Sequence, residues 1–130
     1  RQGKLLYWGV SHWSGEQIAE GCAVADRLLA LRPISNQPSY SILDREIEAG
    51  ILSASERAGV GQIVFSPLAQ GVLTGKYGAG RRPEQSRASD PKRNRWMQDV
   101  LKDDVLARID QLRPIADEQG CSLAQLALAL

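Results

Sequence analysis

Three short apolar runs in this chain each end in side chains that carry hydroxyl, amide or imidazole groups. In chain order, these terminal groups are Ser11-His12, Asn36-Gln37 and Ser66. In parallel α/β folds, ligands bind at the carboxyl ends of the strands. Three such ends in succession, followed by a basic segment, therefore predict a ligand site at one edge of a sheet.

The basic segment covers residues 76–95 and holds seven basic but only two acidic side chains, whereas the whole chain has 16 Lys and Arg against 15 Asp and Glu. A local excess of positive charge in a neutral protein favours a small anionic ligand. The segment offers a single aromatic side chain, Tyr77, for stacking on bases. We therefore expect no nucleic-acid partner.

Two segments resemble catalytic motifs but fail on their spacing. The segment 71–76 has three residues between its glycines where a phosphate-binding P-loop has four, and Tyr77 follows its lysine instead of Ser or Thr. The segment 9–13 ends in Trp13, where a nucleophile elbow needs glycine. His12 has no adjacent acidic partner, so we interpret it as a polar contact at a strand end rather than as a general base.

The composition is that of an ordinary globular chain, with 130 residues, 43% of them hydrophobic and 24% charged. Cys22 and Cys121 lack zinc-site spacing, so we expect free buried thiols, no metal and a reducing, cytoplasmic compartment. No apolar run approaches the roughly 18 residues of a membrane span, and we expect neither a membrane segment nor a signal peptide. Because the sequence opens on Arg1 without Met, we expect it to begin inside a longer protein.

The elements that must position these groups alternate between strands and helices. Capping boxes at Ser14-Gln17 and Ser122-Gln125 predict two helix starts, and Pro33 is expected to end the first helix. The predicted strands cover residues 4–10, 33–37 and 61–65. The predicted helices cover 14–32, 43–58, a region from Trp96 with a kink at Pro114, and 122 to the last residue; residues 66–95 are expected to form a long loop. This order predicts a parallel sheet with helical crossovers, with too few strands to close a barrel.

Five stretches of the sequence together resemble the aldo-keto reductases. They are residues 3–11, 36–41, 65–77, 86–89 and 115–118. Within that superfamily they are most similar to the branch that contains the potassium-channel β subunits and the bacterial glyceraldehyde-3-phosphate reductases. The resemblance spans nearly the whole chain, in order.

The resemblance implies an α/β fold that is part of a (β/α)8 TIM barrel. Residues 1–130 would form the C-terminal portion of a single NADP-dependent oxidoreductase domain, with about strands five to seven and their helices, and the chain alone would not close the barrel. Residues 66–95 would be a loop that covers the cofactor. The family binds NADPH across the carboxyl ends of the strands.

Ten residues match cofactor-binding positions of the family. Ser11, His12 and Gln37 match the contacts to the nicotinamide carboxamide, and Phe65 matches the aromatic residue that stacks on the nicotinamide ring. The positions along the pyrophosphate path and at the phosphates are Ser66, Pro67, Leu68, Gln70, Lys76 and Arg87. Three residues depart from the family pattern: His12 stands where Asn or Arg is more frequent, Phe65 replaces Tyr or Trp, and Gln85 replaces a Tyr of the channel-subunit branch.

The resemblance also implies what this chain lacks. The family's catalytic Asp, Tyr, Lys and His come from the first four strand ends, which would precede residue 1, so we expect no catalytic residue here. Tyr7 and Tyr40 are the local candidates for a general acid, but neither reproduces that cluster. The parent protein would reduce a small aldehyde or ketone with NADPH, in a monomer or an oligomer, and the isolated chain would be inactive, marginally stable and prone to aggregate. An NADPH-sensing regulatory subunit and a scaffold without nucleotide binding are the alternatives.

Overall fold

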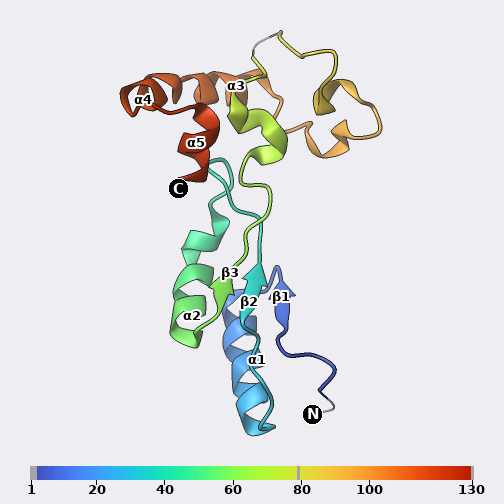
Figure 1. The fold of residues 1–130 in the computed structure, drawn as a ribbon, viewed down its shortest axis with the longest axis vertical. Coiled ribbons are helices and arrows are strands. Elements are labelled where there is room, and N and C mark those ends of the chain that lie inside the picture. Colours follow the sequence, from blue (N-terminus) through green and yellow to red (C-terminus); the bar gives the residue numbers. More distant parts are fainter. Residues whose placement is uncertain (1–2, 79, 130) are drawn as a thin grey trace. The chain divides into compact units, whose positions relative to one another are not determined.

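The computed structural model describes residues 3–78 and 80–129. The chain divides into two compact units, of which the first contains Arg1–Tyr40 and Asp44–Phe65 and the second contains Ser41–Leu43 and Ser66–Leu130. Figure 1 shows the ribbon of both units. Each unit is described by itself below.

The first unit is built on a parallel sheet of three strands in the order β1-β2-β3. The strands are β1 (Gly9–Ser11), β2 (Ser35–Gln37) and β3 (Gly61–Gln62). Gly9 pairs with Ser35, and Ser35 in turn pairs with Gly61. This confirms the predicted parallel sheet with crossovers.

The strands are shorter than predicted, because pairing stops where a neighbour is lacking. Leu5, Leu6 and Tyr7 precede β1 as exposed residues, although their side chains are apolar. Beyond β3, pairing resumes only as an isolated bridge between Ser39 and Phe65. Apolar content alone therefore overestimated the length of all three strands.

Two α-helices, α1 (Gly15–Arg27) and α2 (Ile51–Ala58), lie side by side along the sheet in Figure 1. Helix α1 begins at the predicted capping box and ends at Arg27, well before Pro33, with Leu28 as its C-cap. The chain leaves the helix there because Leu29 takes a left-handed conformation with φ 50°. The second predicted helix is divided at Gly50, which has φ 139° and separates the 3₁₀ helix η1 (Glu46–Ala49) from α2.

One face of the sheet is buried and the other is exposed to solvent. Asn36 is wholly buried, and its neighbours in register are Val10 and Gln62. Ser11 and Gln37 pair with each other one position further along, and both are exposed. Side chains alternate between the faces of a strand, so Ser11 and Gln37 belong to the opposite, open face.

The second unit is helical. Its core contains the fully buried residues Val72, Tyr77 and Met97. The prediction that residues 66–95 form a loop is partly wrong, because this segment contains short 3₁₀ helices. The elements are η2 (Ala69–Thr74), η3 (Arg87–Ser89), η4 (Asn94–Trp96), α3 (Asp103–Asp110), α4 (Arg113–Glu118) and α5 (Leu123–Leu128).

The last helices also differ from expectation. Trp96 ends η4, and α3 begins only at Asp103. Pro114 lies in the first turn of α4, where a missing N–H costs nothing, so it begins a helix instead of kinking one. Helix α5 starts at its predicted capping box and ends at Leu128; the last residue, number 130, lies outside the described residues.

The two thiols have different surroundings. Both cysteines are free, and Cys22 is buried on α1 as predicted. Cys121 follows the end of α4 and is only partly buried, so the predicted burial of its thiol is wrong. Within residues 3–78 and 80–129, no helix is long and apolar enough to cross a membrane.

Candidate functional site

At the carboxyl end of the sheet, β1 and β2 are joined through Ser11 and Gln37. The Ser11 hydroxyl donates to the main-chain carbonyl of Gln37 at 2.9 Å, and the N–H of His12 donates to the same carbonyl at 3.4 Å. The Gln37 side-chain amide has no hydrogen-bond partner among the described residues. It therefore presents a free donor and a free acceptor beside a hydroxyl.

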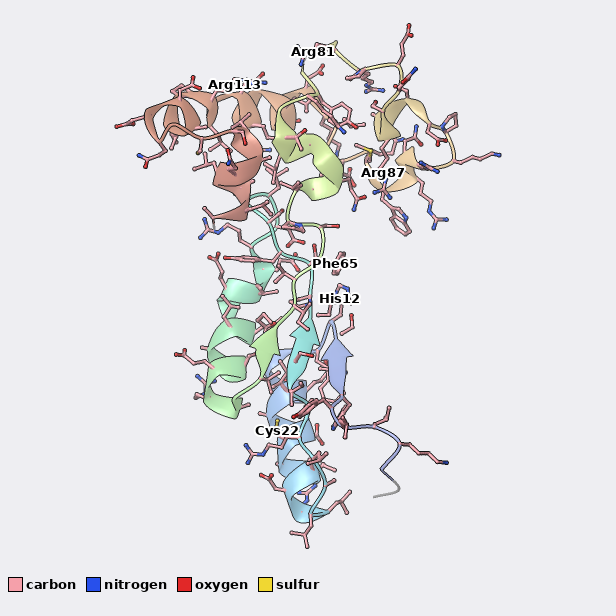
Figure 2. All side chains as sticks on the ribbon, in the orientation of Figure 1. His12, Cys22, Phe65, Arg81, Arg87 and Arg113 are labelled. Carbon is pink, nitrogen blue, oxygen red and sulfur yellow. The ribbon has the colours of Figure 1, made fainter. Side chains whose placement is uncertain are left out.

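The rings of His12 and Phe65 lie against each other just beyond the same strand ends (Figure 2). Their centroids are 5.3 Å apart with an interplanar angle of 67°, which is an edge-to-face contact. Phe65 remains 39% exposed, and its N–H donates to the carbonyl of Pro38 at 3.0 Å. The main chain thus holds a partly open aromatic ring against the His12 imidazole, for which the described residues offer no hydrogen-bond partner.

The Asn36 side chain fixes the turn that carries His12, through hydrogen bonds to the main chain of the next residue, Trp13. His12 has φ 57°, a left-handed conformation that is uncommon for a residue other than glycine. The buried Asn36 carboxamide accepts from the Trp13 N–H at 3.3 Å and donates to the Trp13 carbonyl at 3.4 Å. The Trp13 ring packs on Gly21 of α1, where any Cβ would come within 2.4 Å of it.

Tyr40, Glu48 and Arg45 form a hydrogen-bonded cluster in the first unit. The Tyr40 phenol donates to Glu48 Oε1 at 2.7 Å, and Arg45 donates to both oxygens of Glu48 at 2.8 and 2.9 Å. The bond to Glu48 raises the pKa of Tyr40, while the bonds from Arg45 and Tyr40 lower the pKa of Glu48. A phenol that holds its proton more tightly is a weaker general acid, so Tyr40 is a poor proton donor. Tyr7 is 71% exposed and precedes β1, so it lies at the opposite end of that strand from Ser11.

In the second unit, the residues from 66 to 76 form a tight, unusual turn. Ser66, Ala69 and Gln70 all have positive φ, at 56°, 46° and 59°. The Gln70 amide donates to the Ser66 hydroxyl at 2.8 Å, and the carbonyl of Leu68 accepts from the N–H groups of Gly71 and Leu73. Strained backbone of this kind is concentrated at ligand sites.

Lys76 and Arg87 are exposed cations in the same unit. The Lys76 ammonium lies 5.2 Å from the centre of the Tyr77 ring. Arg87 donates through Nε to the carbonyl of Arg93 at 3.1 Å, and both line a hollow of about 630 Å³. The other lining residues of this hollow are Glu84, Gln85, Ser86, Ser89 and Asp90.

The structure therefore assembles the predicted residues in two groups, each within one unit. Ser11, His12, Gln37 and Phe65 lie together in the first unit, and Ser66 contacts Gln70 in the second. The second unit also contains Pro67, Leu68, Lys76 and Arg87. Among the described residues, no hydrogen bond or ring contact joins Lys76 to Arg87. Their roles towards a cofactor stay predictions.

Sequence reasoning missed two groups that support these residues. The sequence pattern predicts Asn36 only as a polar group at a strand end, although a polar residue at an inward-facing strand position indicates a buried contact. Arg113, whose guanidinium donates to the Gly75 carbonyl at 2.9 Å, stands 38 residues away in the sequence and has no local signal.

Among the residues that the structure describes, no group of three or more His, Cys, Asp or Glu side chains could hold a metal ion. The first unit offers a flat amide and a ring face, and the second offers cations and a strained turn. In general, ring faces stack on planar heterocycles, and cations bind phosphate.

Comparison with known proteins places this chain in a family. The model of the Aldo/keto reductase family matches residues 1–129. A protein of Arabidopsis thaliana named as a probable voltage-gated potassium channel subunit beta is 44% identical over 129 residues. A protein of Oryza sativa subsp. japonica with the same name is 44% identical over 128 residues.

Each match covers 98% of this chain but only 39% of the relative. The chain thus spans about two fifths of the length of these curated relatives. The family match, by contrast, extends over almost all of its residues. This chain belongs to the aldo/keto reductase family.

Proposed function

We propose that this chain supplies the cofactor-binding part of an NADPH-dependent reductase of aldehydes or ketones. Members of the family generally bind NAD(P)H and form a (β/α)8 barrel, and the chain would contribute about strands five to seven. The observation that carries the proposal is the hydrogen bond between Ser11 and Gln37, the last residues of β1 and β2, next to the ring pair of His12 and Phe65. This cluster offers the groups that a nicotinamide ring with its carboxamide requires.

In this proposal, the free Gln37 amide and the Ser11 hydroxyl bind the carboxamide and fix which face of the nicotinamide ring is presented. His12 adds an imidazole on the same side, and Phe65 supports the ring from its exposed face. NADPH bound there would supply the hydride for the carbonyl carbon. The shared hydrogen bonds on the Gln37 carbonyl hold Ser11 and His12 in place before any ligand arrives.

The residues of the second unit would bind the phosphates. Ser66, Pro67, Leu68 and Gln70 form the strained turn, and its positive-φ backbone favours an anion beside the main chain. Lys76 and Arg87 supply the charge, since a guanidinium binds phosphate in two-point fashion. The surplus of cations in residues 76–95 favours NADPH over NADH, because NADPH carries one more phosphate.

The proton that must reach the carbonyl oxygen would come from outside this chain. The Tyr40 phenol is occupied by Glu48, which makes it a poorer donor. The sequence has one histidine, His12, assigned above to the cofactor. We therefore propose that the chain binds cofactor, in the cytoplasm, but does not turn over a carbonyl substrate alone.

The test is a titration of the purified chain with NADPH, followed by tryptophan fluorescence, with circular dichroism to show that the chain is folded. Ser11→Ala and Gln37→Ala should each weaken saturable quenching by about threefold to tenfold, the worth of one hydrogen bond. Ser53→Ala is the matched control, because its hydroxyl also donates to a main-chain carbonyl, that of Gly50, at 3.2 Å. Equal quenching in all variants, or none in a folded chain, would refute cofactor binding at this cluster.

A regulatory subunit that senses NADPH is the second candidate, favoured by the names of both plant relatives. To separate it from an enzyme, the chain can replace the matching 129 residues of the Arabidopsis relative. Oxidation of NADPH that depends on an added aldehyde would support a reductase. Tight NADPH binding without turnover would support a sensor, and the absence of binding would leave a scaffold.

A further inference from the structure

The main chain around Lys76 is held by two arginines from outside the turn. The carbonyl of Gly75 accepts from Arg113 Nη2 at 2.9 Å, although Arg113 lies 38 residues later, at the start of α4. The carbonyl of Lys76 accepts from Arg81 Nε and Nη2 at 3.4 and 3.3 Å. The peptide carbonyls before and after the Lys76 Cα are thus both bound by guanidinium groups, and Figure 2 labels both arginines.

Arg113 is itself fixed on its other side. Its Nε donates to Asp110 Oδ1 at 2.8 Å, and Asp110 is the last residue of α3. Both side chains are about half exposed, so the ion pair alone contributes little to stability. Its effect is geometric, because it leaves Nη2 aimed at the Gly75 carbonyl.

Gly75 is closely packed by Arg113 and by α5, and no side chain would fit at its position. It is buried with φ 74°, and a Cβ at this position would come within 2.6 Å of Leu123 Cδ1 and 3.2 Å of Arg113 Nη2. The turn is therefore pressed between the guanidinium and α5. After it, Tyr77 is 1% exposed and anchors the chain in the core.

Between these fixed points, Lys76 alone is exposed, with its ammonium 5.2 Å from the Tyr77 ring centre. We propose that Arg113 is a positioning residue that fixes the backbone at Lys76 and thereby aims the ammonium at a phosphate of the cofactor. This inference rests on the proposed function for its ligand. The fixing of the backbone itself does not depend on any ligand.

The test uses Arg113→Gln in the full chain, with Arg108→Gln as the matched control. Arg108 is also an exposed arginine paired with an aspartate, Asp104 at 3.2 Å, one helix earlier. Hydrogen exchange of the amides at 75–78 reports on the turn without cofactor, and titration with NADPH reports on binding. Arg113→Lys keeps a donor for the Gly75 carbonyl and should restore part of any loss.

Arg113→Gln should speed exchange at 75–78 and weaken NADPH binding about fivefold to tenfold, whereas Arg108→Gln should change neither. Because Arg113 acts through Lys76, its substitution should weaken binding less than twofold further in a Lys76→Met background. Full additivity in that background, or unchanged exchange at 75–78, would overturn the inference. If the folded native chain binds no NADPH, the proposed function fails, and the exchange rates alone decide whether Arg113 fixes the turn.

Discussion

The carboxamide of Asn36 bonds to the main chain of Trp13 in both directions. Its Oδ1 accepts from the Trp13 N–H at 3.3 Å, and its Nδ2 donates to the Trp13 carbonyl at 3.4 Å. The side chain thereby continues the pairing of β2 with the chain beyond β1, where the left-handed turn at His12 has ended the ladder. The buried amide of Asn36, on one face of β2, thus positions Ser11 and His12. These two residues lie next to Gln37, whose side chain belongs to the other face of β2.

Replacing Asn36 by leucine should lower the free energy of unfolding by about 2 kcal/mol, because the partly buried Trp13 N–H and carbonyl would lose their partner. Gln62→Leu is the matched control in the adjacent strand. Both polar atoms of the Gln62 side chain are buried without a partner among the described residues, so their removal should be neutral or stabilising. Urea unfolding measures both, and equal losses would show that the contact to Trp13 carries no weight.

The cluster of Tyr40 and Glu48 makes a prediction about pH. Glu48→Gln should lower the pKa of Tyr40 towards its ordinary value of 10.0, because the acceptor that most disfavours the phenolate becomes neutral. Alkaline titration of phenolate absorbance measures this shift. The same titration of Tyr40→Phe identifies which transition belongs to Tyr40, and an unchanged transition in Glu48→Gln would contradict the contact.

The sign of the pH effect on stability follows from the two directions. The lowered pKa of Glu48 stabilises the fold above its ordinary value of 4.5, and this contribution is lost as pH falls through the folded-state pKa. The raised pKa of Tyr40 stabilises below 10.0, and that contribution is lost as pH rises through the folded-state pKa. The cluster therefore supports the chain between these limits.

The sequence predicted a helix boundary correctly where the interactions that set this boundary lie within a few residues of it. The capping boxes at Ser14 and Ser122 form as predicted, because all their atoms lie within four residues. The end of α1 was missed because Leu29 takes a left-handed conformation that an apolar side chain does not signal. The break at Gly50 was missed because the apolar spacing continues across it.

The candidate site shows the same limit. The strand-end groups could be predicted, since parallel strands bring their carboxyl ends to one edge, and Ser11 does contact Gln37. The resemblance to the reductases supplied their roles, which geometry alone leaves open. The inward-facing position of Asn36 indicates a buried contact but not that its partner is Trp13. The bond from Arg113 to the Gly75 carbonyl spans 38 residues and has no local signal.

The two capping boxes predict helix stabilities that can be compared directly. Ser14→Ala and Ser122→Ala should each destabilise the fold by about 1 kcal/mol, because each removes an acceptor for an N–H of the first turn. Threonine at either position should retain most of the stability, since it keeps the hydroxyl. Thermal unfolding followed by circular dichroism measures this, and equal losses for alanine and threonine would contradict a capping role.

Gly75 and Gly80 separate backbone strain from steric crowding. Their φ angles are nearly equal, at 74° and 71°, but a Cβ at Gly80 meets no atom within 4 Å. Gly80→Ala should therefore cost only about 1 kcal/mol of left-handed strain. Gly75→Ala should cost a further 1–3 kcal/mol or so, because its Cβ would meet Leu123 Cδ1 at 2.6 Å. Equal unfolding free energies for the two variants would mean that α5 does not press on the turn, and Lys76 would then lose one of the contacts that fix it.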